Sequence, residues 1–172
     1  SMGYEIPAAI GAYYATRKKI YCIAGDGSIM MNLQELAYIG GKKLPIKIFL
    51  FNNEGYHSIR QTQQNYFPDN VVGCGKESGL PFPDFKILAE GFGLQYILSR
   101  KEEFIEKDLL DVESNDLPII NEILLDLEQQ FVPKLSSKKM SDGTMITSEI
   151  EDMYPFLPKQ IMEKIKKEAF GI

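Results

Sequence analysis

The chain has 172 residues, of which 44% are hydrophobic, and a formal net charge of −5. This length and apolar content predict one globular domain with its own core, and the acidic balance argues against nucleic acid as a partner. We expect neither a membrane span nor a secretory signal peptide, because no stretch has the required apolar pattern. The two cysteines lack the spacing of a metal site. A reducing cytoplasm is the expected compartment.

The first half of the chain predicts an α/β unit. Alanine-rich residues 7–16 favour a helix that begins near a proline. Short apolar runs at 20–24 and 46–51 read as buried parallel strands, and residues 32–43 carry helical spacing between them. Both strands then end at the same edge of the sheet, where open α/β sheets bind ligands.

Two polar corners follow these strands: Gly25-Asp26-Gly27-Ser28 after the first and Asn52-Asn53 after the second. The glycines can adopt backbone angles closed to other residues, and they let a ligand approach the main chain. A helix that begins after Ser28 offers free N–H groups for phosphate. One carboxylate, one amide oxygen and a main-chain carbonyl suit Mg²⁺. Taken alone, however, Asp26 is also explained as a helix-capping residue and Asn52-Asn53 as a common turn.

The rest of the chain predicts further elements of the same kind. They are a short helix at 54–64, a long loop at 65–82, a helix at 84–92, a strand at 94–98, an amphipathic helix at 101–110, a strand at 118–125 and a terminal helix at 159–170. The strand at 118–125 alternates enough to be an edge or later strand. His57, the only histidine, has either a backbone role or an acid–base role, and Arg60 either meets a substrate carboxylate or lies on a solvated helix face.

Two motifs resemble a known family. Gly-Asp-Gly, then residues 28–51, then Asn-Asn resembles the thiamine diphosphate signature. The start of the chain, Met-Gly-Tyr-Glu-Ile-Pro-Ala-Ala-Ile-Gly-Ala at residues 2–12, is similar to a stretch of acetolactate synthase-like enzymes. The resemblance implies a three-layer α/β/α thiamine diphosphate-binding fold with a mostly parallel sheet. It covers residues 1–130, the diphosphate-side domain, and leaves 131–172 as a tail that packs on the domain or on a partner.

The resemblance also implies a site. Its metal ligands for Mg²⁺ are Asp26, Asn53 and the carbonyl of Gly55. Its residues for binding thiamine diphosphate are Met2, Gly25, Gly27, Ser28, Asn53, Tyr56 and His57. Met2 corresponds to the apolar residue that props the cofactor in a bent conformation.

The implied activity is decarboxylation or carboligation of 2-keto acids. The chain opens directly on the Met-Gly-Tyr motif, so we expect an N-terminally truncated domain, a cloned fragment or one product of a split gene. We identify no catalytic acid or base, and expect the chain to be inactive without a pyrimidine-binding domain, supplied upstream or in trans, within a homo-oligomer. The absence of tryptophan near Thr62 leaves the keto acid open. Three alternatives stay open: a non-catalytic cofactor-binding module, a subunit of a split 2-keto acid decarboxylase, and a domain for another phosphorylated ligand.

Overall fold

The computed structural model describes residues 1–140 and 142–171, without the side chains of residues 138, 139 and 170. The chain divides into two compact units, Ser1–Gln129 and Gln130–Ile172. Both predicted corners lie in the first unit. Each unit is therefore described by itself.

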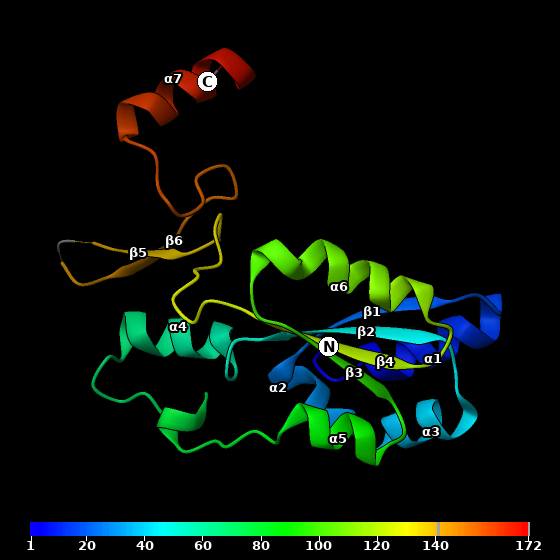
Figure 1. Cartoon of the computed structure of the whole chain (residues 1–172). Helices are drawn as coiled ribbons and strands as arrows, with labels where there is room; N and C mark the ends of the chain where they lie inside the picture. Colours follow the sequence, from blue (N-terminus) through cyan, green and yellow to red (C-terminus); the bar gives the residue numbers. More distant parts are fainter. Residues whose placement is uncertain (141, 172) are drawn as a thin grey trace. The chain divides into compact units, whose positions relative to one another are not determined.

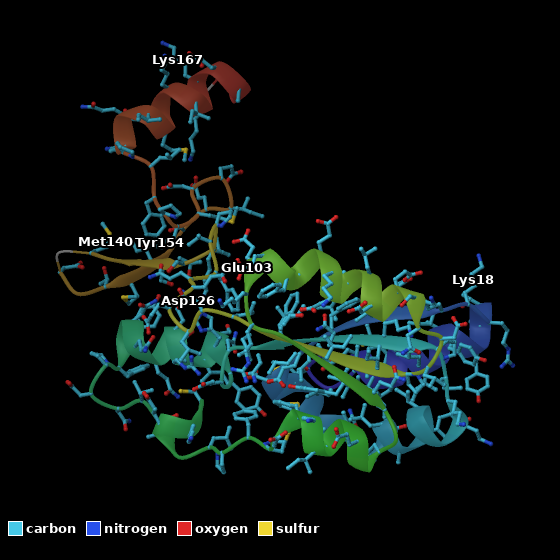
Figure 2. All side chains as sticks on the ribbon, viewed as in Figure 1. Lys18, Glu103, Asp126, Met140, Tyr154 and Lys167 are labelled. Carbon is cyan, nitrogen blue, oxygen red and sulfur yellow. The ribbon has the colours of Figure 1, made fainter. Side chains whose placement is uncertain are left out.

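The first unit is built on a parallel sheet (Figure 1). Its strands are β1 (Ile20–Gly25), β2 (Ile46–Asn52), β3 (Gln95–Ser99) and β4 (Ile119–Leu124), in the order β1-β2-β4-β3. All pairs are parallel, so every strand ends at the same edge. In Figure 2, Lys18 precedes β1 and Asp126 follows β4, and the two labels mark opposite ends of this sheet.

Helices cover both faces of this sheet. On one face lie α1 (Glu5–Thr16), α3 (Glu35–Lys42) and α5 (Phe85–Gly91), and on the other lies α6 (Glu102–Ser114) (Figure 1). Two further helices follow strand ends: α2 (Asp26–Ile29), which continues into a 3₁₀ turn at Met30–Asn32, and α4 (His57–Tyr66). A second 3₁₀ turn spans Lys76–Ser78. The predicted three-layer α/β/α class is confirmed.

The core lies between the sheet and the α1, α3 and α5 layer. Ile6 of α1 and Ile39 of α3 are fully buried, as are Ile48 and Leu50 of β2 and Ile120 of β4. The continuous apolar runs of the strands follow from this burial, because a parallel sheet with helices on both faces offers little solvated surface.

The opposite face is covered only in part. Over β3 and β4, Ser99 donates a hydrogen bond to Asp108 of α6 (2.6 Å) and accepts one from Asn121 (2.9 Å). Over β1, Tyr21 and Ile23 remain 51% and 65% exposed. The Tyr21 hydroxyl is bonded to Glu113 at the end of α6, so this helix reaches β1 but leaves its apolar side chains largely exposed.

Three elements differ from the predictions in position or bounds. The strand at 118–125, predicted as an edge or a later strand, is β4; it lies between β2 and β3, and its buried Asn121 and Glu122 form hydrogen bonds with those neighbouring strands. The helix predicted at 32–43 is present as α3 but begins only at Glu35, because α2 and the 3₁₀ turn precede it. The amphipathic helix extends to Ser114 rather than ending at residue 110.

The second unit contains a β-hairpin and a helix. The strands β5 (Ser137–Lys139) and β6 (Met145–Thr147) pair antiparallel, Lys134 and Tyr154 exchange main-chain hydrogen bonds of 2.8 and 2.9 Å, and α7 spans Lys159–Phe170. The helix was predicted, whereas the hairpin was not. Across both units, the described residues include no helix long and apolar enough to span a membrane.

A pair of adjacent glycines in α3 tests the packing of this fold. A Cβ on Gly40 would lie 1.9 Å from the carbonyl oxygen of Phe92, whereas a Cβ on Gly41 would meet nothing within 4 Å. We expect Gly40→Ala to lower the free energy of unfolding by about 2 kcal/mol or more, because backbone would have to move. Gly41→Ala should raise it by about 0.5–1 kcal/mol, because alanine favours helix. Urea unfolding followed by circular dichroism measures both, and equal effects would contradict the described packing.

Candidate functional site

The site is formed where β1 and β2 end side by side. Gly25 and Phe51 are partners in the parallel register, so the chain turns at Asp26 and at Asn53 next to each other. The Asp26 carboxylate joins the two turns: Oδ1 accepts the N–H of Gly27 and Oδ2 accepts the N–H of Gly55, both at 2.7 Å. The two predicted corners are therefore one structural unit.

Asp26 is a buried carboxylate that is only partly compensated. It is 1% exposed. Burial raises its pKa above the ordinary value, while the N–H groups of Gly55 and Gly27 and the charge of Arg60 oppose this shift. Within the part of the chain that the structure describes, no salt bridge involves Asp26. A cation beside this carboxylate would supply the missing compensation.

The turn after β2 is held in an unusual backbone conformation. Glu54 has φ +57° and Gly55 has φ +137°. A positive φ is uncommon for a non-glycine residue such as Glu54. Arg60 of α4 donates to the carbonyls of Asn53 (3.0 Å) and Glu54 (2.6 Å). Arg60 is thus a support for the turn, a role that was not predicted for it.

Glycine is required at position 55 because the long loop at 65–82 contacts the main chain there. Tyr56 donates its N–H to the carbonyl of Cys74 (2.7 Å), and Gly55 forms a β-bridge with Gly75. A Cβ on Gly55 would lie 2.1 Å from the Cys74 carbonyl oxygen. The loop at 65–82 is therefore anchored on the turn, a long-range contact that no local pattern in the sequence indicated.

The glycines of the first corner act differently from the prediction. Neither Gly25 nor Gly27 has a positive φ. Gly27 is needed because the ring of Tyr56 lies where its Cβ would be, at 2.5 Å, and Tyr56 packs edge-on against Phe82. Gly25 has open space around its Cβ position. Neither glycine uses the backbone angles that are closed to other residues, whereas the open approach to the main chain is present at Gly25.

The Met2-Gly3 segment is tied to the first corner. Gly3 donates its N–H to Ser28 Oγ (2.8 Å), and Asn32 Nδ2 donates to the Gly3 carbonyl (2.5 Å). Met2 is 51% exposed beside these contacts. Ser28 keeps its own hydroxyl proton as a donor. Asn32 was not predicted as a site residue, although it follows the glycine corner by only a few positions.

His57 is the first residue of α4 and is buried. Its main-chain N–H donates to the carbonyl of Gly55 (3.0 Å), so its backbone takes part in the turn. This geometry favours the backbone role over the acid–base role.

A second carboxylate lies behind the asparagine turn. Glu122 of β4 accepts hydrogen bonds from Asn52 Nδ2 (2.5 Å) and from the hydroxyl of Tyr96 on β3. Burial and the bond to Glu122 raise the pKa of Tyr96. Glu122 was not among the predicted site residues, because its hydrogen bonds to Asn52 and Tyr96 join strands that are far apart in the sequence.

The donor set fits a divalent ion held by mixed oxygen ligands. Among the described residues, no group of three or more His, Cys, Asp and Glu side chains is placed to hold a metal. Each oxygen of the Asp26 carboxylate can accept more than one bond, and the Asn53 amide and the Gly55 carbonyl belong to the turn that Asp26 contacts. Such a set of one carboxylate, one amide and one carbonyl suits Mg²⁺ when phosphate oxygens complete the shell.

Comparison with known proteins agrees with this geometry. Residues 1–120 match the family described as thiamine pyrophosphate enzyme, C-terminal TPP binding domain. The acetolactate synthase large subunit of Porphyra purpurea is 33% identical over 147 residues, 85% of this chain and 24% of that protein. The acetolactate synthase isozyme 2 large subunit of Escherichia coli K12 is 35% identical over 127 residues, 73% of this chain and 23% of that protein. The chain thus spans about a quarter of the length of these relatives.

The burial of Asp26 predicts a pH dependence of stability. As the pH rises above 3.8, the ordinary value, the unfolded chain loses this proton before the folded chain does. The metal-free folded state should therefore lose stability through this window, relative to Asp26→Asn, which does not titrate there.

Thermal unfolding of both chains at several pH values, without divalent ions, measures the difference. The contributions of the other carboxyl groups to the pH dependence cancel in this difference, because both chains carry them. The amide of Asp26→Asn changes the stability by an amount that does not depend on pH. A difference that stays flat, or that favours the wild type as the pH rises, would contradict the described burial.

Proposed function

This chain belongs to the thiamine pyrophosphate enzymes as their C-terminal cofactor-binding domain, and from that membership we propose that it binds the diphosphate of thiamine diphosphate through Mg²⁺ in an acetolactate synthase-like enzyme. The observation that carries this proposal is the 2.7 Å hydrogen bond between Asp26 Oδ2 and the Gly55 N–H. It supports a shared binding site, because it brings the carboxylate to the asparagine turn.

In the proposed complex, Asp26, the Asn53 amide and the Gly55 carbonyl hold Mg²⁺. The main chain at Gly25 and Gly27 and the Ser28 hydroxyl bind the diphosphate, together with the turn at Tyr56 and His57. Gly25 supports close approach, since no atom beyond its own chain neighbours lies within 4 Å of its Cβ position. Met2, tied through Gly3 to Ser28, would support the bound cofactor in its bent conformation.

Thiamine diphosphate, when bound, supplies a thiazolium carbon that adds to a 2-keto acid and a ring that accepts electrons as the carboxyl group leaves. The residues of this chain would bind the diphosphate, orient the cofactor and exclude water at the two turns. We assign no proton-transfer step to any of them. We do not assign which 2-keto acid is the substrate.

The rest of the enzyme is part of the proposal. The relatives are about four times as long as the matched part of this chain, as their 24% and 23% coverage indicates. We propose that a pyrimidine-binding domain, upstream or in trans, completes the site within a homo-oligomer, and that residues 1–130 form the cofactor domain while 131–172 pack on it or on a partner. The free thiols of Cys22 and Cys74 support a reducing compartment such as the cytoplasm.

Binding should require both divalent metal and the two corners. We expect isothermal titration to show thiamine diphosphate binding with Mg²⁺ and much weaker binding without it. Asp26→Asn and Asn53→Ala should each weaken metal-dependent binding by more than about tenfold, because the first replaces a charged carboxylate ligand by a neutral amide and the second removes an amide oxygen. Asp69→Asn and Asn70→Ala are matched controls in the exposed part of the loop. Metal-independent binding, or equal loss in the controls, would argue for another phosphorylated ligand.

Activity should require a pyrimidine-binding domain in addition to the residues described above. We expect no measurable decarboxylation of pyruvate by the isolated chain with Mg²⁺ and thiamine diphosphate, and turnover after addition of a pyrimidine-binding partner. Turnover by the isolated chain would contradict the expectation that catalysis needs a pyrimidine-binding domain. Cofactor binding without turnover in the presence of partners would instead favour the non-catalytic module.

A further inference from the structure

Glu122 lies at the centre of a hydrogen-bond network behind the asparagine turn. Its strand, β4, runs between β2 and β3, and its side chain is 7% exposed. One carboxylate oxygen accepts from Asn52 at the end of β2, and the other accepts from the Tyr96 hydroxyl on β3. The carboxylate thus joins all three strands at the level of the site.

A carboxylate in this position determines how the Asn52 amide is oriented. Ionised Glu122 can only accept hydrogen bonds, so the NH₂ group of Asn52 must face it. The amide oxygen must then face the other way, where it accepts the main-chain N–H of Glu54 (2.9 Å). A rotated amide would present hydrogen-bond donors to Glu54 and an acceptor to Glu122, and would lose both bonds.

The N–H held by Asn52 belongs to the residue with the uncommon backbone conformation. Glu54 has φ +57°, and such conformations persist only where the surroundings determine them. Glu54 lies between Asn53 and Gly55, both assigned above to the metal. The orientation of the Asn52 amide is therefore transmitted to the two ligands that this turn contributes.

We propose that Glu122 is a positioning residue for the magnesium site, acting through Asn52 on the turn at Glu54, an inference that rests on the proposed function. Glu122 contacts neither metal nor cofactor in this role. The network also lines a cavity of about 390 Å³ with Lys76 and Arg100 at its wall, so water can reach these groups when the carboxylate is removed. Removal should consequently disturb the turn more than the fold.

The first test compares Glu122→Leu, which has similar size and no acceptor, with Glu122→Gln, which can accept from Asn52 and donate to Tyr96. In the metal-free chain, hydrogen exchange of the Glu54 amide followed by NMR should be at least about tenfold faster in the leucine variant and close to wild type in the glutamine variant. Unchanged exchange in Glu122→Leu would overturn the proposal without any cofactor being present.

The second test measures the Mg²⁺ concentration for half-maximal binding of thiamine diphosphate. Loss of a supporting residue behind a metal ligand weakens metal affinity about 10–100-fold, so we expect at least a tenfold rise for Glu122→Leu and less than a threefold rise for Glu122→Gln. If both variants lose affinity equally, the charge of Glu122 acts rather than its geometry, and the proposal is wrong.

A double-mutant cycle with Asn52→Ala separates positioning from a structural role. Because Glu122 acts through Asn52, Glu122→Leu should have no further effect on the Mg²⁺ requirement once Asn52 is alanine. An undiminished effect in that background would overturn the proposal. Asn121→Leu is the matched control, since Asn121 is equally buried on the opposite face of the same strand, and it should leave the Mg²⁺ requirement unchanged.

These outcomes are distinct from failure of the proposed function. A wild-type chain that binds no thiamine diphosphate with Mg²⁺ contradicts the proposed function, and this assignment with it. A wild-type chain that binds, together with a leucine variant that binds equally well, contradicts this assignment alone.

Discussion

The site depends on one carboxylate held between two strand ends. Asp26 is buried and receives main-chain N–H groups from its own turn and from the turn after β2, so it connects segments that are far apart in the chain. A parallel sheet makes this contact available, because adjacent parallel strands end at the same edge. The same burial that makes the carboxylate a good cation ligand raises its pKa and costs stability when no cation is bound.

The surrounding residues can be understood as supports for that contact. Gly27 leaves room for the ring of Tyr56, and Gly55 leaves room for the Cys74 carbonyl. Arg60 donates to two carbonyls of the asparagine turn, and Asn52 accepts the Glu54 N–H. Several independent contacts thus hold a turn whose backbone conformation is unfavourable by itself, as is common at ligand-binding sites.

The sequence predicted the elements whose pattern is local. The apolar runs at 20–24 and 46–51 became β1 and β2 with nearly the same bounds, since continuous burial leaves a continuous apolar signal. An edge was one of the two positions predicted for β4, because its pattern alternates, although Asn121 and Glu122 are buried and bonded to neighbouring strands. The two corners were found because their residue types carry the chemistry. Arg60, Asn32 and the Cys74–Gly75 anchor were not, because their roles arise from contacts that only the folded chain brings together.

The most direct test of this account is a crystal structure of the chain with thiamine diphosphate and Mn²⁺ in place of Mg²⁺. The account predicts an anomalous difference peak bounded by the Asp26 carboxylate, the Asn53 amide oxygen and the Gly55 carbonyl, with the diphosphate completing its coordination. A diphosphate bound elsewhere, or an ion that contacts neither Asp26 nor Asn53 while both turns are ordered, would contradict it.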